Sequence, residues 1–494
     1  MSKTAAGAVS VGIIGAGISG LLMGIRLKQA GIDSFTIYEK ADDVGGTWKH
    51  NTYPGLHCDV PSHLYSYSFS PNPNWTQPFA SQREIQAYLR SCADKYDLNP
   101  HLRMGISIET AAYQQDDGVW ELTTATGEVI RHNVLVGATG GLTAPNLPKI
   151  SGLALFEGPS WHSGAWRHDI DLRGKRVAVI GSAASAVQVV PHVADAAREL
   201  FVFQRSPNWV MPRRNKPYSE DMKAAFADPD SDALRRHRRD LYRGSLLTYR
   251  VFRRDPRAIA MLRAYALKHM QSAISDPDMV AALTPDYDPG CKRLLVSDEY
   301  YPALAKPHVS LIASGVEALT ENAVLATDGR VAEVDIVIFC TGYKRGGRED
   351  GRPAVEIIGP NDLPLLHALY KRPYSYRGVA VPGFPNYFTI CGINGTVAYS
   401  SLFYSAELHA DYILRCIQEM QARGLKSVEA RADIAQAHSD ALQEELQQMS
   451  WSTGQCTNFY LDQNGRNLSF YPGSLGRLRR ELSRLGLEEF TLTR

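Results

Sequence analysis

The chain has 494 residues, of which 44% are hydrophobic, and its formal net charge is +1. This length corresponds to about three domains of ordinary size, and the composition is that of a soluble globular protein. The balanced charge gives no support for binding to nucleic acid, and no stretch is long and apolar enough for stable membrane insertion.

The cysteines and the first apolar run exclude further classes of protein. The cysteines show neither a C-x-x-C pair nor a metal-ligand spacing, which argues against a metal site and against the disulfide reductases. An odd, unpatterned set indicates a reducing cytoplasm rather than a disulfide framework. The apolar run 9–25 contains five glycines and no convincing cleavage site, so we interpret it as a strand and a helix start. The seven cysteines are Cys58, Cys92, Cys291, Cys340, Cys391, Cys416 and Cys456.

The first elements in the chain have the pattern of a dinucleotide-binding unit. In such a unit Gly15 makes a tight turn, Gly17 lets the backbone approach a pyrophosphate, and Gly20 permits close packing of the helix on the strand. The helix start then faces the phosphates. Glu39 is placed to accept hydrogen bonds from a ribose, which favours FAD or NAD over NADP. The pattern is strand 9–14, turn 15–20, helix 21–30, strand 35–38 and Glu39.

The next loop decides between these two cofactors. Gly45-Gly46-Thr47-Trp48 resembles the flavin-contacting loop of the flavin-containing monooxygenases, and this favours FAD. Cys58-Asp59-Val60-Pro61-Ser62, followed by Tyr65, resembles the segment that carries the active-site aspartate of the Baeyer–Villiger monooxygenases. The resemblance implies that Thr47, Trp48, Asp59 and Tyr65 contact cofactor. Taken alone, an aspartate in this setting is more often a turn former.

A helix is predicted over 81–98, followed by a small β-insertion. Its strands are predicted around 106–108 and Tyr113, over 119–124 and over 129–136. The family resemblance implies that the backbone of Ile108 holds the adenine end of FAD.

Residues 137–166 lie between two nucleotide-binding units. The first part, with Pro145 and Pro148, is predicted to be a stiff linker that crosses between domains. The second part resembles the fingerprint of the Baeyer–Villiger monooxygenases. We interpret its histidine as structural or conformational, with a general base as the alternative. The fingerprint residues are Phe156, Gly158, His162 and Trp166.

A second dinucleotide unit follows, with a strand over 176–180 and another over 200–204. Its turn departs from the glycine pattern, because Ala183 stands at the second glycine position, where it is expected to crowd the pyrophosphate. Arg205 and Ser206 replace the acid after the second strand, and an arginine there accommodates a 2′-phosphate, which favours NADPH. The turn residues predicted to bind it are Gly181, Ser182, Ala183, Ser185 and Ala186.

Residues 216–288 are rich in Arg, Ala and Leu at helical spacing, and we expect a helical insertion whose basic cluster is a solvated face. The insertion ends at Gly290-Cys291-Lys292-Arg293. In the Baeyer–Villiger family this motif carries a lysine that reaches the NADPH 2′-phosphate and an arginine over the flavin. The resemblance implies these roles for Lys292 and Arg293.

The remaining chain is predicted to complete the second unit and return to the first. Thr341-Gly342-Tyr343 resembles a closing motif of NADPH domains in flavoproteins with two dinucleotide units. The tail 451–473 resembles the C-terminus of a subset of these enzymes and is expected to line the substrate pocket. Strands are predicted over 309–312 and 335–339, and helices over 399–423 and 430–448.

The predicted fold class is α/β, with two Rossmann-like domains for FAD and NADPH, the second inserted into the first. The predicted FAD-binding domain comprises 1–143 and 375–494, and the NADPH-binding domain comprises 144–215 and 289–374 around the insertion 216–288. The resemblance, to class B flavoprotein monooxygenases of the Baeyer–Villiger type, implies a cytoplasmic enzyme that uses FAD, NADPH and O₂. It implies insertion of oxygen into a ketone through a flavin C4a-peroxide, giving an ester or lactone.

Two alternatives remain open from the sequence. The same flavin intermediate could oxygenate a small-molecule sulfide or amine, or the chain could be a flavin reductase that acts with a partner. Arg293 and Asp59 favour the ketone, because a nucleophilic peroxide and the resulting alkoxide both need a nearby positive charge. Arginine is effectively always charged, and we expect Asp59 to orient it.

Overall fold

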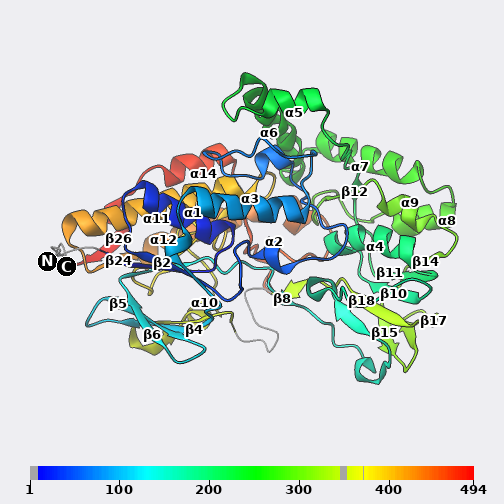
Figure 1. Ribbon diagram of the computed structural model, residues 1–494, viewed down its shortest axis with the longest axis horizontal. Helices are drawn as coiled ribbons and strands as arrows, with labels where there is room; N and C mark the ends of the chain where they lie inside the picture. The colour runs from blue at the N-terminus through cyan, green and yellow to red at the C-terminus, as the bar shows by residue number, and fades with distance from the viewer. Residues whose placement is uncertain (1–8, 345–352, 371) are drawn as a thin grey trace.

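The computed structural model describes residues 9–344, 353–370 and 372–494. Its framework is two five-stranded sheets, each flanked by helices (Figure 1). The strand orders are β22-β7-β1-β2-β3 and β14-β11-β10-β18-β9, and every neighbouring pair in both sheets is parallel. This confirms the predicted α/β class with two Rossmann-like units.

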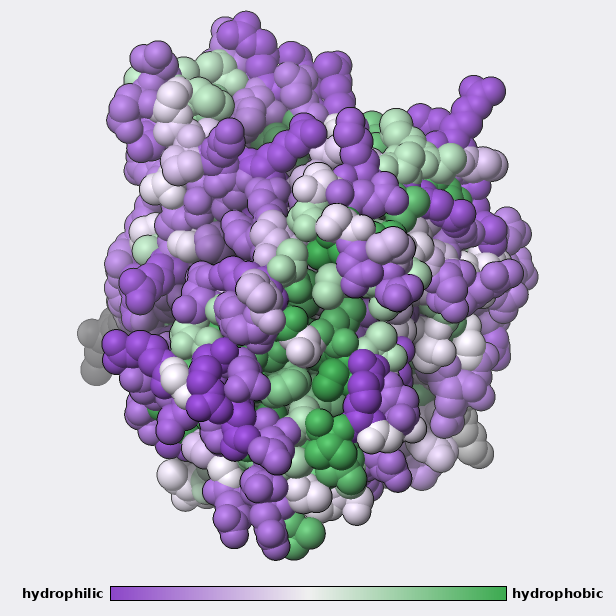
Figure 2. Space-filling model, turned by 90° about the vertical axis from the view of Figure 1, so that its right-hand side faces the viewer, coloured by the Kyte–Doolittle hydropathy of each residue, from purple (hydrophilic) through white to green (hydrophobic). Residues whose placement is uncertain are grey.

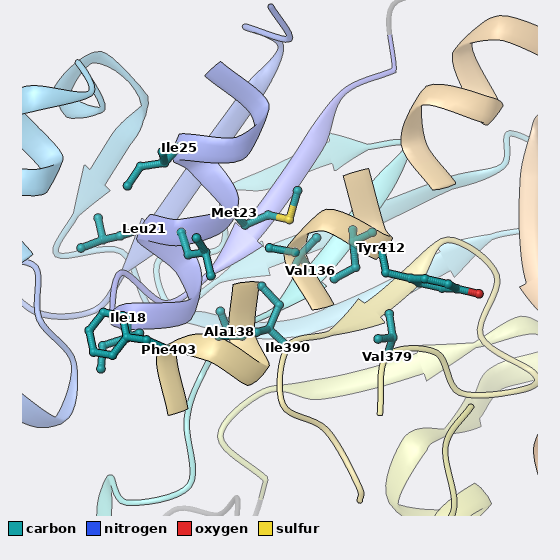
Figure 3. Packing of buried hydrophobic residues seen from close by; sticks show 14 of the residues in the cluster. Ile18, Leu21, Met23, Ile25, Val136, Ala138, Val379, Ile390, Phe403 and Tyr412 are labelled. Atoms are coloured by element: carbon teal, nitrogen blue, oxygen red, sulfur yellow. The ribbon is translucent and has the colours of Figure 1, made fainter. Parts of the chain in front are cut away.

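The first sheet is built around the first dinucleotide pattern. Its central strand is fully buried, as a parallel strand covered on both faces must be. Helix α1 packs against α11, and Figure 3 shows Ile18 of α1 beside Phe403 of α11 and Met23 of α1 beside Val136. The elements are β1 (Val11–Ile14), α1 (Ile18–Gln29), β2 (Phe35–Glu39), β3 (Leu102–Met104), β7 (Val134–Gly137), β22 (Tyr387–Thr389) and α11 (Leu402–Arg423).

A third five-stranded sheet lies below the first sheet in Figure 1 and has the order β21-β20-β4-β5-β6. The predicted strand over 129–136 is wrong in one respect, because it is two strands that belong to different sheets. Asn133 stands between them, and its side chain accepts a hydrogen bond from Ser10 N at 2.9 Å. The strands are β4 (Ile108–Gln114), β5 (Val119–Thr124), β6 (Val129–His132), β20 (Glu356–Gly359) and β21 (Leu363–Pro364).

The second sheet carries the second dinucleotide pattern, and its strand β10 has the predicted bounds. A three-stranded antiparallel sheet, which the sequence analysis did not predict, follows β14. The elements are β9 (Ser160–His162), β10 (Arg176–Ile180), α4 (Ala184–Ala196), β11 (Glu199–Phe203), β14 (Val309–Ile312), β15 (Val316–Leu319), β16 (Ala323–Ala326), β17 (Val331–Glu333) and β18 (Ile336–Phe339).

The predicted insertion is helical and runs from the top of Figure 1, with α5 and α6, down its right side to α8. Seen from the side of the second sheet, the molecular surface is mostly hydrophilic, with a band of hydrophobic surface through its middle (Figure 2). Among the described residues, no helix has the length and apolar character needed to cross a membrane. The insertion comprises α5 (Glu220–Phe226), α6 (Asp232–Phe252), α7 (Pro256–Gln271) and α8 (Pro277–Leu283), followed by β13 (Leu295–Val296), which pairs with β12 (Val210–Met211), and by α9 (Tyr300–Leu304).

Two segments of the chain cross between the first and the second dinucleotide unit, one outward and one on the return. They meet where β8 (Ala144–Pro145) pairs antiparallel with β19 (Tyr343–Lys344). The outward crossing contains β8, which lies within the segment 137–166. The return lies earlier than predicted, because β20 already pairs with β4 of the third sheet. We therefore draw the proposed end of the NADPH-binding domain before Glu356 rather than at 374.

The C-terminal part returns to the first sheet (Figure 1). Its helices are close to the predicted ones, whereas the strand pair β24–β26 and helix α14 were not predicted. The elements are α10 (Leu365–Tyr370), β23 (Thr396–Val397), β24 (Ser427–Ala430), α12 (Ala432–Gln447), α13 (Ser450–Thr453), β25 (Phe470–Tyr471), α14 (Leu475–Leu482) and β26 (Phe490–Thr493).

The interpretation of the cysteines is wrong for one pair, because Cys291 and Cys456 form a disulfide. The other five cysteines are free. The bonded residues are separated by 165 positions in the chain, and their sequence spacing therefore carries no sign of the pairing.

Candidate active site

The first glycine turn is held in place by Glu39. One oxygen of the Glu39 carboxylate accepts a hydrogen bond from Ala16 N at 2.8 Å, and the other accepts one from Ala41 N at 2.9 Å. Gly15 has φ +104°, and a Cβ on Gly20 would lie 1.8 Å from the carbonyl oxygen of Gly15. The turn therefore requires glycine at both positions, and Glu39 stands at the end of β2 beside it.

The starts of α1 and α4 fit phosphate groups. Their N-cap residues, Gly17 and Ala183, are extended and make no side-chain cap hydrogen bond, and neither helix has an acid in its first turn. By contrast, α3 (Gln82–Lys95), α5, α6, α7, α8, α11 and α14 are each capped by a serine or aspartate side chain. The first N–H groups of α1 and α4 are therefore available to an anion, as in the pyrophosphate sites of dinucleotide folds.

The loop 45–48 lies against the first turn. Gly45 N donates to Ala16 O at 2.9 Å, and α2 (Thr47–His50) begins directly after this contact. Trp48 Nε1 donates to the hydroxyl of Tyr65 at 3.0 Å, so these two predicted cofactor residues form one buried unit. Ile108 is buried at the start of β4, two residues after a backbone bond from Ile106 N to Glu39 O. The predicted FAD residues are thus grouped around one turn.

Asp59 and Arg293 form a two-pronged ion pair across 234 positions of sequence. Arg293 Nε donates to Asp59 Oδ2 at 2.5 Å, and Arg293 Nη2 donates to Asp59 Oδ1 at 2.6 Å. The carboxylate of Asp59 raises the pKa of Arg293 above its ordinary value. The arginine side chain is 50% exposed, which leaves part of the guanidinium open to a further ligand. Such parallel contacts fix the plane of the guanidinium.

The second nucleotide turn carries a cluster of positive charge. Lys292 Nζ donates to Ser206 Oγ at 2.9 Å and lies 4.6 Å from the ring centroid of Tyr287. Burial, and then the positive charge of Arg205, lower the pKa of Lys292. Two cations and a hydroxyl therefore converge after β11, where a dianionic phosphate would relieve their repulsion.

The remaining predicted residues of this turn lie as follows. Ser182 Oγ donates to Ser206 O at 2.9 Å, which joins the glycine turn to the basic cluster. Ala183 is exposed as the N-cap of α4, and Ala186 is fully buried one turn into the helix. Ser185 is half-buried in the first turn of α4, and the Tyr53 hydroxyl of the first unit donates to Gln188 Oε1 of the same helix at 3.2 Å. Gly181 has φ +126°, and a Cβ there would lie 2.3 Å from Cys340 O.

Three fingerprint residues pack at or near the edge of the second sheet. Phe156 is buried, and a Cβ on Gly158 would lie 2.3 Å from Asp335 O, so this position requires glycine. Trp166 packs edge-on against Trp161 of β9, with ring centroids 5.7 Å apart.

His162 is the last residue of β9, and its Nδ1 accepts a hydrogen bond from Gly164 N at 3.0 Å. Its ring lies edge-on to Tyr343, with centroids 5.3 Å apart, and Tyr343 donates a hydrogen bond from its hydroxyl to Asn51 of the first unit. This chain of contacts connects the second sheet to the segment after the flavin loop, which favours a conformational role for His162.

The structure adds residues that the sequence analysis did not single out. Asn208 Nδ2 donates to Ser182 O at 2.9 Å, and Tyr287 lies under Lys292. The tail residue Tyr460 lies four residues after Cys456, whose disulfide to Cys291 places this part of the tail beside the turn that carries Arg293. The tail was expected to line the substrate pocket, but no local sequence pattern identifies Asn208, Tyr287 or Tyr460 individually.

Comparison with known proteins gives concordant results. The family model described as "Flavin-binding monooxygenase-like" matches residues 8–227. A Baeyer–Villiger monooxygenase of Streptomyces coelicolor is 39% identical over 98% of this chain and 93% of its own length. A Baeyer–Villiger monooxygenase of Pseudomonas aeruginosa is 40% identical over 95% and 88% of the two chains. A crystal structure of OTEMO in complex with FAD and NADP is 25% identical, with a TM-score of 0.86, over 99% and 100%.

Proposed function

Because the chain belongs to the Baeyer–Villiger monooxygenases, we propose that it uses FAD and NADPH to insert one oxygen atom of O₂ into a small-molecule ketone. The product is an ester or a lactone. The observation that carries this proposal is the two-pronged Arg293–Asp59 pair, which joins the segment after the flavin loop to the segment that holds Lys292. FAD, when bound, supplies the redox chemistry and the activation of O₂.

The FAD site proposed here is the first glycine turn with the loop packed on it. The start of α1 binds the pyrophosphate through its uncapped N–H groups, and Glu39 accepts the ribose hydroxyls. The backbone near Ile108 holds the adenine end. Trp48 and Tyr65, which hydrogen-bond to each other, give the isoalloxazine ring a rigid apolar neighbour.

The NADPH site proposed here is the second glycine turn with the basic cluster. Lys292, Arg205 and Ser206 bind the 2′-phosphate, which supports NADPH over NADH. Ala183 is exposed, and it adds a methyl group where a dinucleotide turn commonly has glycine. His162 transmits movement of the linker to this site through Tyr343.

Arg293 is the proposed catalytic cation. Its guanidinium stabilises negative charge that develops on the oxygen of the ketone, and Asp59 holds it in one orientation. Because the neighbouring carboxylate raises its pKa, Arg293 keeps its charge over the whole working pH range. Oxygenation of a sulfide or amine creates no such alkoxide, so the pair favours a ketone.

We also propose the domain division given above, with the NADPH-binding domain ending before Glu356, and a cytoplasmic location. The pairing of β20 with β4 supports the boundary. Five free cysteines support a reducing compartment, in which the bond between Cys291 and Cys456 is open to reduction.

The proposal is tested with FAD-loaded enzyme, NADPH, ¹⁸O₂ and a panel of cyclic and linear ketones and sulfides. One ¹⁸O atom in an ester product, with one NADPH consumed per ester, is the expected result. Labelled sulfoxide without any ester would favour heteroatom oxygenation. Hydrogen peroxide as the sole oxygen product with every compound would contradict a monooxygenase and support a reductase.

A further inference from the structure

The disulfide Cys291–Cys456 lies directly beside the catalytic candidates. Cys291 immediately precedes Lys292 and Arg293, and Cys456 belongs to the C-terminal tail. The bond therefore joins the turn that carries both proposed cofactor-contacting cations to a segment 165 residues away. This paired position has no part in the function proposed above.

The turn and the tail also make polar contacts around the bond. Ser450 Oγ donates to Gly290 O at 3.0 Å, and Asp288 N donates to Gly454 O at 3.4 Å. A Cβ on Gly454 would lie 2.6 Å from Cys291 Cβ, so the tail backbone passes closely over this cysteine. The two segments are thus packed together at the disulfide.

Beyond the disulfide the tail is held by contacts within its own segment. Asn458 Oδ1 accepts a hydrogen bond from Tyr460 N at 2.9 Å, and Asn458 Nδ2 donates to Trp451 O at 2.7 Å. The ring of Tyr460 packs against Phe470, with centroids 4.5 Å apart. Arg293 lies two residues after one bonded cysteine, and Tyr460 lies four residues after the other.

The two ends of this tail segment are held differently. At its far end, Phe470 and Tyr471 form β25, which pairs with β23 near the first sheet. At its near end, the disulfide is the only covalent link between the turn and the tail among the described residues. Cys291 is fully buried, whereas Cys456 is partly exposed and flanked by exposed Gln455 and Thr457. A thiolate can therefore approach the bond from the Cys456 side.

We propose that Cys291 and Cys456 are a redox-responsive positioning pair, whose disulfide holds the tail 454–461 beside the turn that carries Arg293, so that Tyr460 forms one wall of the ketone site. This inference rests on the proposed function, since it names a wall of that same site. When the bond is intact, the tail is pre-organised beside the turn that carries the arginine, whose side chain stays half exposed and open to the ketone. When it is reduced, the tail loses this anchor, and the ketone binds less tightly.

A small-molecule dithiol can reduce the disulfide between Cys291 and Cys456. The dithiol attacks the disulfide and becomes a cyclic disulfide, while each cysteine sulfur gains one electron and one proton. In the reverse direction, hydrogen peroxide oxidises the two thiols to the disulfide and yields two molecules of water. Uncoupled turnover of a flavoprotein monooxygenase supplies that peroxide in place.

The experiment compares oxidised and dithiol-reduced holoenzyme after removal of the reductant, with the redox state verified by alkylation and peptide mass spectrometry. Reduction is expected to raise the KM for ketone by about three- to tenfold and to increase the peroxide released per NADPH. Hydrogen exchange of residues 454–461 is expected to accelerate. The doubly substituted variant Cys291→Ser with Cys456→Ser should resemble reduced enzyme and should not respond to dithiol.

A variant of Tyr460 and a measurement of thermal stability separate the proposed positioning role from a general loss of stability. Tyr460→Phe retains the disulfide and should leave the exchange of 454–461 unchanged while raising the KM for ketone. A verified reduction that changes neither exchange nor KM overturns the proposal, as does a loss of thermal stability with KM and coupling unchanged. A third outcome is that no ketone is oxygenated in either redox state while the hydrogen exchange of residues 454–461 still accelerates on reduction. That result would contradict the proposed function but would support the role of the disulfide in holding the tail.

Discussion

The basic cluster after β11 makes a sharp prediction about cofactor choice. Lys292 is half-buried, its Nζ lies 2.9 Å from Ser206 Oγ, and burial together with Arg205 lowers its pKa. A 2′-phosphate placed between these groups would gain a charge-assisted hydrogen bond from Lys292, which contributes about 1.5–3 kcal/mol. Because about 1.4 kcal/mol corresponds to tenfold in affinity, loss of this bond weakens binding by about 10- to 150-fold.

We therefore expect Lys292→Met to raise the KM for NADPH by about 10- to 150-fold and to leave the KM for NADH nearly unchanged. The assay is steady-state oxidation of each nucleotide at a saturating ketone concentration. Lys175→Met is the matched control, since Lys175 is an exposed lysine at the opposite end of β10. An equal loss with NADPH and NADH would refute the reasoning, and so would an unchanged ratio between them.

Three more predictions concern the first unit and the buried histidines. Glu39→Gln weakens the acceptor of two backbone N–H groups, and fluorescence titration of the apoprotein should show FAD affinity about tenfold lower; unchanged affinity would exclude the proposed role. Asp59→Asn leaves Arg293 without its charged partner, and ester formation should fall by about 10- to 100-fold while anaerobic flavin reduction by NADPH changes less. Burial lowers the pKa of His63 and His409 to about 3 and that of His132 to about 4. These histidines stay neutral in the folded state but bind protons on unfolding below pH 6.5, so stability decreases as the pH falls. From pH 6.5 to 5.5 the loss is about 1 kcal/mol for each histidine, measured by urea unfolding, and a flat profile would contradict it.

The sequence predicts those parts of the fold that local pattern determines. The strand over 176–180 was predicted with the bounds of β10, because a short apolar run before a glycine turn is typical of a buried parallel strand. The run 129–136 was not divided correctly, because alternation of side chains shows neither which sheet a strand joins nor its register. The hydrogen bond from Ser10 to Asn133 marks the change of sheet.

Long-range contacts in the site were accessible only through family resemblance or through the structure. The contact between Lys292 and Ser206 spans 86 positions, and no spacing rule predicts it. The disulfide had no signal at all, since two isolated cysteines look like any other unpaired ones. The return to the first unit before Glu356 is likewise a matter of strand pairing, which hydrophobic periodicity does not encode.

The most direct test of the central claim is the turnover of Arg293→Ala with a ketone and with a sulfide, each measured against wild-type enzyme. The account predicts that ester formation falls by about 100- to 1,000-fold, because the only proposed charge for the developing alkoxide is removed, while sulfoxide formation falls much less. Both rates are measured after verifying FAD content and flavin reduction by NADPH. Ester formation that persists within about tenfold of wild type would contradict the assignment of Arg293 as the catalytic cation.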